Sequence, residues 1–155
     1  MPQQPIHPAC LPKSTGSDAS LTLPTNPYEF TLGGLDFLAT SAWSSAGRSV
    51  SDLRRLSGVH SSCDLMELIL RWQHLAPTCP DTVDGYPFEK RDPFVMDGVF
   101  PHVMVAGNQP ATESRWFEGS NGERCLMISV ARFSRTQTLV LLDLDTMEVL
   151  EERFA

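Results

Sequence analysis

Basic residues are scarce in this 155-residue sequence, where twelve Lys and Arg stand against nineteen Asp and Glu and give a formal charge of −7. Phosphate contacts require clustered Lys and Arg, so this balance argues against a chain that grips nucleic acid by itself. Apolar runs are also short, and none approaches the roughly 20 residues of a membrane-spanning helix. The composition therefore predicts neither a directly bound nucleic acid nor a membrane as partner.

Paired cysteines are missing as well. The sequence has four cysteines, Cys10, Cys63, Cys79 and Cys125, and no CxxC pair. This spacing excludes a zinc knuckle and a thioredoxin-type redox motif, while a disulfide stays open by arithmetic. Isolated thiols are most often plain buried residues, so we predict reduced, structural cysteines.

Catalytic signatures are equally hard to find. The sequence contains no GxSxG, P-loop or GxGxxG pattern, and its four histidines never occur as HxH or HxxxH. Asp143 and Asp145 would lie roughly 7 Å apart if both stood on one face of a strand, which suits acid–base chemistry or a metal. No histidine adjoins them, so a solvated strand face is the favoured interpretation. Motifs alone do not predict an enzyme.

The prolines divide the chain. Six of the twelve lie within residues 1–27, six lie between Pro77 and Pro110, and none follows. Each proline removes a backbone donor and restricts its predecessor, so residues 1–27 are predicted to be an extended segment of the domain formed by residues 28–155. Thr78–Phe100 reads as a long loop, packed or functional, whose candidate buried aromatics are Tyr86, Phe88 and Phe94.

Strand patterns dominate what remains. Tyr28–Leu32 and Leu35–Thr40 flank Gly33-Gly34, which predicts a β-hairpin with a two-residue turn. Further predicted strands are His102–Ala106, Arg124–Ala131, Gln137–Leu144 and Met147–Phe154.

Two helices are expected between these strands, Val50–Leu56 and Asp64–Leu75. The second has Ser61 or Ser62 as its N-cap and should stop before Pro77. Its apolar stripe consists of Leu65, Leu68, Ile69, Trp72 and Leu75. We expect Leu68, Ile69 and Trp72 to be buried against a sheet that contains Val103 and Val105.

One short segment invites a chemical interpretation. The apolar strand before Gly107 leads into Gly107-Asn108-Gln109-Pro110, and strand ends are where α/β enzymes place reactive side chains. The Asn108 amide oxygen is a weak metal ligand, whereas a plain turn after a core strand is the favoured interpretation.

A series of short segments, in order and at suitable spacing, resembles the small, second (B) subunits of DNA polymerase delta over roughly residues 2–150. The positions that carry this resemblance are Pro2, Gln3, Gln4, Pro5, Asn26, Pro27, Asp52, Pro77, Asp81, Tyr86, Pro87, Phe88, Asp92, Pro93, Phe94, Pro101 and His102.

The resemblance implies an α+β fold, namely a partial β-sandwich of the metallophosphoesterase (calcineurin-like) type with two flanking helices. It implies that an OB domain and the first half of the sandwich lie outside this sequence. Small subunits of this kind are nuclear scaffolds that bridge the C-terminal metal-binding region of the catalytic subunit to a further accessory subunit. They meet DNA only through the complex and need no cofactor.

Active relatives of this fold carry Gly-His-x-His where this chain has Gly107-Asn108-Gln109-Pro110. Asn108 and Pro110 then stand in place of the two imidazoles, and proline offers a metal no donor atom. The resemblance therefore implies an inactive site without metal. Two alternatives stay open, a metal-dependent phosphodiesterase of the calcineurin-like superfamily and an unrelated β-rich binding module.

Overall fold

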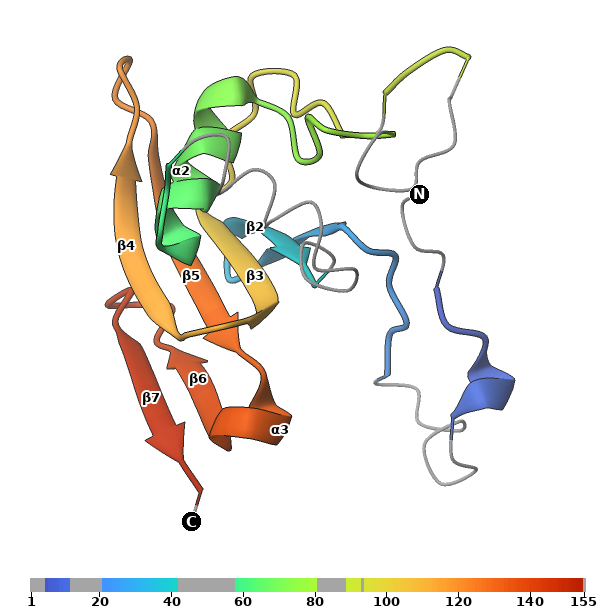
Figure 1. Ribbon diagram of the computed structural model, residues 1–155, viewed down its shortest axis with the longest axis vertical. Coiled ribbons are helices and arrows are strands. Elements are labelled where there is room, and N and C mark those ends of the chain that lie inside the picture. The colour runs from blue at the N-terminus through green and yellow to red at the C-terminus, as the bar shows by residue number, and fades with distance from the viewer. Residues whose placement is uncertain (1–4, 12–20, 42–57, 81–88, 93, 155) are drawn as a thin grey trace.

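The computed structural model describes residues 5–11, 21–41, 58–80, 89–92 and 94–154 (Figure 1). A five-stranded sheet has the order β1-β2-β3-β5-β4, and a separate two-stranded sheet pairs β6 with β7. The strands are β1 Tyr28–Leu32, β2 Leu35–Thr40, β3 Val103–Gln109, β4 Glu113–Glu118, β5 Arg124–Ala131, β6 Thr138–Leu142 and β7 Val149–Arg153. The helical segments are η1 Pro8–Cys10, α2 Ser62–Trp72 and α3 Phe133–Thr136. Within these described ranges, no helix is long and apolar enough to cross a membrane.

The predicted hairpin is confirmed. β1 and β2 pair antiparallel with Leu32 opposite Leu35, and Gly33 and Gly34 have φ values of 60° and 80°. A two-residue turn of this kind needs positive φ at both central positions, which glycine adopts without steric cost. The Gly-Gly dipeptide therefore determines where the chain reverses.

The middle of the large sheet is parallel. β2 pairs with β3 and β3 with β5 in parallel, while β4 closes the sheet by pairing antiparallel with β5. β4 was not among the predicted strands, because only Phe117 of its six residues is buried and the others are half-buried or exposed. An edge strand with one inward side chain has too weak an apolar pattern to stand out in a sequence.

Helix α2 has Ser61, one of the two expected residues, as its N-cap, and it begins with a capping box at Ser62, two residues before the predicted start. The Ser61 hydroxyl accepts a hydrogen bond from the Asp64 N–H at 3.0 Å, and the Asp64 carboxylate accepts one from the Ser61 N–H at 3.4 Å. The helix ends at Trp72, three residues before the predicted end, because Gln73 adopts the left-handed conformation at φ 53°. A residue in this conformation ends many helices, and here it comes before Pro77, the residue before which the helix was expected to stop.

The predicted buried face of this helix was partly wrong. Ile69 is fully buried as expected, but Leu68 is half-buried and Trp72 is 47% exposed. Leu65, Met66 and Leu70 complete the buried face, and the helix packs on β4 and β5. The apolar residues of this segment fit two overlapping stripes at helical spacing, so the spacing alone does not decide which stripe is buried. In addition, the helix ends early, which places Trp72 at its last position.

The sheet beneath α2 contains Val103 and Val105, as predicted. Val103 and Val105 belong to the apolar layer on the opposite side of the sheet, whereas Met104 and Ala106 pack with the helix. Central parallel strands are apolar on both faces, so alternation carries no signal there. Helix-on-sheet packing is observed, with the neighbouring residues of β3 beneath the helix.

The second sheet covers the far face of the first. Phe37, Val103, Leu126 and Ile128 of the large sheet meet inward side chains of β6 and β7 such as Val140. The molecule is thus α+β, with α2 on one side of the five-stranded sheet and a two-stranded sheet on the other (Figure 1). The other predicted flanking helix, Val50–Leu56, lies outside the described residues.

Candidate functional site

The carboxyl ends of β2 and β3 lie side by side, and Gly107-Asn108-Gln109-Pro110 follows the apolar part of β3. The expected strand end at Gly107 was wrong, because β3 continues to Gln109. Gln109 pairs with Ala131 after a bulge, at which Asn108 has φ 57°. A bulge inserts an extra residue and lets pairing resume, so the segment is a kinked strand rather than a tight turn.

Gln109 is the structural centre of this segment. Its side chain is 2% exposed, its amide nitrogen donates to the Gly107 carbonyl at 2.9 Å, and its amide oxygen accepts from the Ser62 hydroxyl at 3.2 Å. These bonds tie the bulge to the first turn of α2. The sequence interpretation missed this role, because a glutamine inside a Gly-x-x-Pro pattern looks like an ordinary turn residue.

Asn108 and Pro110 are both exposed beside this anchor. The Asn108 carbonyl accepts a hydrogen bond from Arg132 Nε at 3.4 Å, so its backbone also supports the kinked strand. Among the described residues, no group of three or more His, Cys, Asp and Glu side chains is placed to hold a metal ion. What this segment does in the structure is connect β3, β5 and α2.

Asn26 makes a second structural contact at this edge. Its amide oxygen accepts from the Thr40 hydroxyl at 3.2 Å and from the Ser41 N–H at 3.0 Å, so it fastens the segment before β1 to the end of β2. A Cβ atom added at Gly107 would lie 3.7 Å from the Thr40 carbonyl oxygen. That distance is an ordinary van der Waals contact, so the structure leaves room for a Cβ atom at Gly107.

The cysteine nearest this edge is chemically quiet. Burial and the neighbouring Glu113 carboxylate raise the pKa of Cys63 to about 11, and burial raises the pKa of Cys125 to about 12. Thiolates, not thiols, act as nucleophiles and metal ligands, and both side chains are protonated at neutral pH. All four cysteines are free, and Cys10 is exposed rather than buried.

Asp92 and Phe94, two positions of the resemblance, hold the long loop against the residues that follow α2. The Asp92 carboxylate accepts from the Phe94 N–H at 2.9 Å and lies 3.0 Å from His74 Nε2. The Phe94 N–H and, after it, His74 lower the pKa of Asp92 below its usual range. Phe94 is buried as predicted, and its carbonyl accepts from the Leu75 N–H at 2.8 Å.

The other positions that carry the family resemblance lie in different parts of the structure. Pro101 is buried, His102 Nδ1 accepts from the Asp36 N–H at 3.0 Å, and Pro5 and Pro77 are exposed. Pro27 is half-buried before β1. Outside the described residues lie Pro2, Gln3, Gln4, Asp52, Asp81, Tyr86, Pro87, Phe88 and Pro93.

The acidic pair near the C-terminus does not share a strand face, so that expectation was wrong. β6 ends at Leu142, and Asp143 begins the turn that leads to β7. Its carboxylate accepts from the Asp145 and Thr146 N–H groups at 2.9 Å each, and those bonds lower the pKa of Asp143. Both aspartates are exposed, which agrees with the solvated interpretation.

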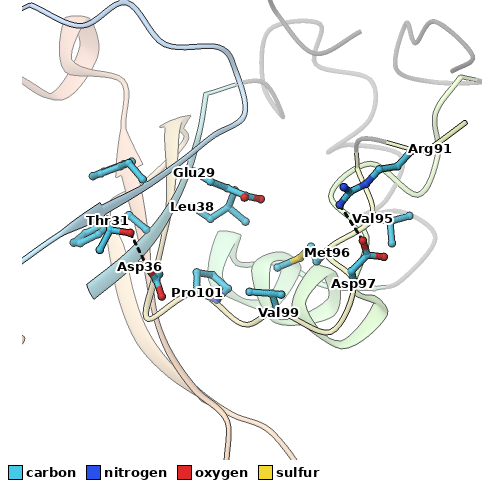
Figure 2. Close-up of a pocket in the computed structure, with 12 residues that line it drawn as sticks. Glu29, Thr31, Asp36, Leu38, Arg91, Val95, Met96, Asp97, Val99 and Pro101 are labelled. Carbon is cyan, nitrogen blue, oxygen red and sulfur yellow. Dashed lines mark hydrogen bonds and ion pairs between the residues drawn. The ribbon is translucent and has the colours of Figure 1, made fainter. Parts of the chain in front are cut away.

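A pocket of about 470 Å³ lies between the β1–β2 hairpin on one side and Arg91 with residues 95–101 on the other (Figure 2). We call it the hairpin pocket. Glu29 and Asp36 line one side, and Arg91 forms an ion pair with Asp97 at 2.9 Å on the other. Sequence reasoning gave no signal for it, because its two sides are some sixty residues apart in the chain.

In the described residues, the strand ends of this α+β fold carry an amide engaged in structural hydrogen bonds, and the thiol of Cys63 beside them is buried and neutral. The sequence profile of one polymerase family, described as the B subunit of DNA polymerases alpha and epsilon, matches residues 1–114. The chain belongs to that family.

Three individual relatives carry the name of one particular polymerase, DNA polymerase delta. The chain is 40% identical over 153 residues to the "Probable DNA polymerase delta small subunit" of Caenorhabditis elegans, covering 99% of this chain and 32% of the relative. It is 36% identical over 177 residues to the DNA polymerase delta small subunit of Saccharomyces cerevisiae, covering 96% and 35%. The Arabidopsis thaliana protein of the same name is 36% identical over 148 residues, covering 96% and 32%. The chain thus spans about a third of the length of these relatives.

Proposed function

We propose that this chain is part of the small accessory subunit of DNA polymerase delta, a non-catalytic nuclear scaffold of DNA replication. It would bridge the C-terminal metal-binding region of the catalytic subunit and a further accessory subunit, and meet DNA only through the complex. Family membership and relatives at 32–40% identity support the assignment to this polymerase. The formal charge of −7 agrees with a partner that is protein rather than DNA.

One observation carries the non-catalytic part of the proposal. At the end of β3, Gln109 is engaged in buried hydrogen bonds with Gly107 and Ser62. Asn108 supplies a backbone carbonyl to Arg132, and Pro110 has no donor atom for a metal. These residues hold strands and helix together, which is a structural use of a position where an active phosphoesterase needs imidazoles.

The fold proposal is that residues 28–155 are the C-terminal part of a calcineurin-like phosphoesterase domain, with residues 1–27 as an extended segment of the same domain. The two sheets packed through Phe37, Val103 and Ile128 support a sandwich. The OB domain and the first half of the sandwich would lie in the part of the relatives that this chain does not span.

Co-expression of the full-length subunit with the catalytic subunit tests the scaffold role. We expect a stable complex on size-exclusion chromatography, and loss of it when the metal-binding C-terminal region of the catalytic subunit is deleted. Separate elution of the two full-length proteins would contradict the proposal.

A phosphodiesterase assay tests the non-catalytic role separately. The full-length subunit alone, supplied with Mn²⁺ or Zn²⁺ and bis(p-nitrophenyl) phosphate, should hydrolyse no more than buffer with metal does. As a matched control, an Asn108→Ala, Pro110→Ala variant should give the same rate. Metal-dependent hydrolysis that this double variant abolishes would establish the phosphodiesterase alternative.

A further inference from the structure

The hairpin pocket lies toward the β1 end of the five-stranded sheet. The helix packs on β4 and β5, at the end of the strand order opposite to β1. Glu29 and Leu38 pair directly across the hairpin, as do Thr31 and Asp36, so all four side chains point to one face. Arg91 and residues 95–101 face them across the pocket, with Val95 and Asp97 on the far side and Val99 and Pro101 below (Figure 2).

Charge excludes several kinds of occupant. Among the described residues, the carboxylates of Glu29, Asp36 and Asp97 line the pocket together with the guanidinium of Arg91. Arg91 is paired with Asp97 at 2.9 Å, and the Asp36 carboxylate accepts from the Thr31 hydroxyl at 2.8 Å. Within the part of the chain that the structure describes, the Glu29 carboxylate has no hydrogen-bond or ion-pair partner. Nucleic acid and nucleotides would meet like charge here, whereas a cationic side chain meets complementary charge.

The opposite wall adds an apolar requirement. Val99 is 67% exposed and Val95 is 37% exposed, although both are aliphatic. Met96, which also lines the pocket, is 8% exposed and anchors the wall to the core. Contact with an aliphatic group would remove the two valines from water, which favours a ligand with an apolar part next to its charge.

The shape favours a polypeptide over a small molecule. A volume of about 470 Å³ is within the usual size of ligand sites, but such sites enclose most of their ligand, and here several lining side chains are open to solvent. β1 is an edge strand, and its outer backbone has no partner among the described residues. An extended segment can pair with such an edge while its side chains enter a neighbouring pocket.

We propose that the hairpin pocket receives an extended segment of another polymerase subunit, with a Lys or Arg side chain directed at Glu29 and an aliphatic side chain on Val95 and Val99. This inference rests on the proposed function as an accessory subunit. The cation pairs with the one carboxylate of the pocket that the described residues leave unpaired, and the aliphatic group covers the exposed valines.

Photo-crosslinking in the purified complex locates the segment. p-Benzoylphenylalanine replaces Val99 in the full-length subunit, and a control carries it at Thr146, an exposed position in the turn between β6 and β7. Mass spectrometry of the Val99 sample should give one peptide of another subunit with adjacent basic and aliphatic residues. The Thr146 sample should not give that peptide.

Charge reversal then tests the recognition. The crosslinked segment, made as a synthetic peptide, should bind the full-length Glu29→Lys subunit about tenfold more weakly than wild type, and less tightly still at higher salt. Glu151→Lys is the matched control, because Glu151 is an exposed strand glutamate on the other sheet, and its affinity should stay within about twofold of wild type. Both variants should keep the wild-type circular dichroism spectrum.

The outcomes separate this inference from the proposed function. If the complex assembles but Val99 labels no other subunit, or labels a second copy of this chain, the pocket inference is wrong and the accessory role stands. If the Glu29→Lys subunit binds the peptide as tightly as wild type, the pocket inference is likewise wrong and the accessory role stands. If the unmodified subunit fails to assemble with the catalytic subunit, the proposed function is wrong and this inference with it.

Discussion

The two sheets of this molecule differ in how far their side chains are buried. In the five-stranded sheet, Met104 and Met127 are fully buried under α2, and Val103 is fully buried on the opposite face. In the two-stranded sheet, the inward residues are only half-buried, and Leu141 and Leu150 on the outward face are 51% and 57% exposed. The first sheet is covered on both sides, and the second on one.

Leu141 and Leu150 stand directly opposite each other across β6 and β7, and Leu139 continues the same face at 45% exposure. An apolar face of this kind normally has a protein partner or is prone to aggregate. The comparison therefore separates buried residues, which stabilise this chain, from exposed apolar residues, which a protein partner would cover.

The largest expected effect concerns this uncovered face. The isolated 155-residue chain should aggregate, because the outward leucines of β6 and β7 meet water. Static light scattering of the chain at increasing concentration measures this. Replacing Leu139, Leu141 and Leu150 together by Ser should keep the chain monomeric to higher concentration. A wild-type chain that stays monomeric and unfolds cooperatively above ordinary mesophile temperatures would contradict the prediction.

In the enclosed region, Ile69→Ala should lower the free energy of unfolding by about 2–5 kcal/mol, because the removed atoms leave a cavity under a fully buried side chain. Urea unfolding of the full-length subunit measures the change. Trp72→Ala is the internal control, since a side chain that is 47% exposed should cost clearly less. Equal losses in the two variants would mean that the helix face is assigned incorrectly.

At the junction of β3 and α2, Gln109→Leu should cost about 1–3 kcal/mol. The substitution keeps the side chain's bulk but leaves the Gly107 carbonyl without its 2.9 Å bond and removes the bond from the Ser62 hydroxyl. Gln109→Glu restores the acceptor but not the donor, so it separates the two bonds in the same urea experiment. Wild-type stability in the leucine variant would show that the bridge is dispensable.

Neighbouring residues of β6 sharpen the comparison within one strand. Leu142→Ala should cost roughly 1–2 kcal/mol, less than a fully buried leucine, because Leu142 packs half-buried on the large sheet. Leu141→Ala should change stability by less than about 0.5 kcal/mol, because that side chain points outward. Thermal unfolding of the full-length subunit compares the two, and a reversed order would place the wrong face inward.

The smallest effect is a pH dependence at the long loop. The Phe94 N–H and His74 lower the pKa of Asp92 from 3.8 in the folded chain. Asp92 therefore stabilises the fold above its unfolded pKa, and this contribution is lost as pH falls through the lowered folded value. Asp92→Asn should reduce the acid sensitivity of unfolding below about pH 4 without a matching change at pH 7. An unchanged acid profile would show that the carboxylate does not matter.

Much of the fold was predictable from local patterns. The Gly33-Gly34 hairpin, the Ser61 cap of α2 and the strand Arg124–Ala131 are where the sequence places them, since turn chemistry, capping and apolar runs act within a few residues. β4 escaped prediction because only Phe117 of its residues is buried. Membership in the family was also predictable, because short motifs that follow one another along the chain indicate it.

Local sequence determines most of the strands, though not β4, together with where the hairpin turns and how α2 begins, because these depend on the conformational preferences of neighbouring residues. The packing of the layers, by contrast, sets Met104 rather than Val103 against the helix, since a strand that is apolar on both sides has no preferred face. Packing also makes Gln109 a buried bridge and brings Glu29 opposite Val99 across a pocket. Contacts between residues far apart in the chain follow from how layers pack, and no local pattern encodes that.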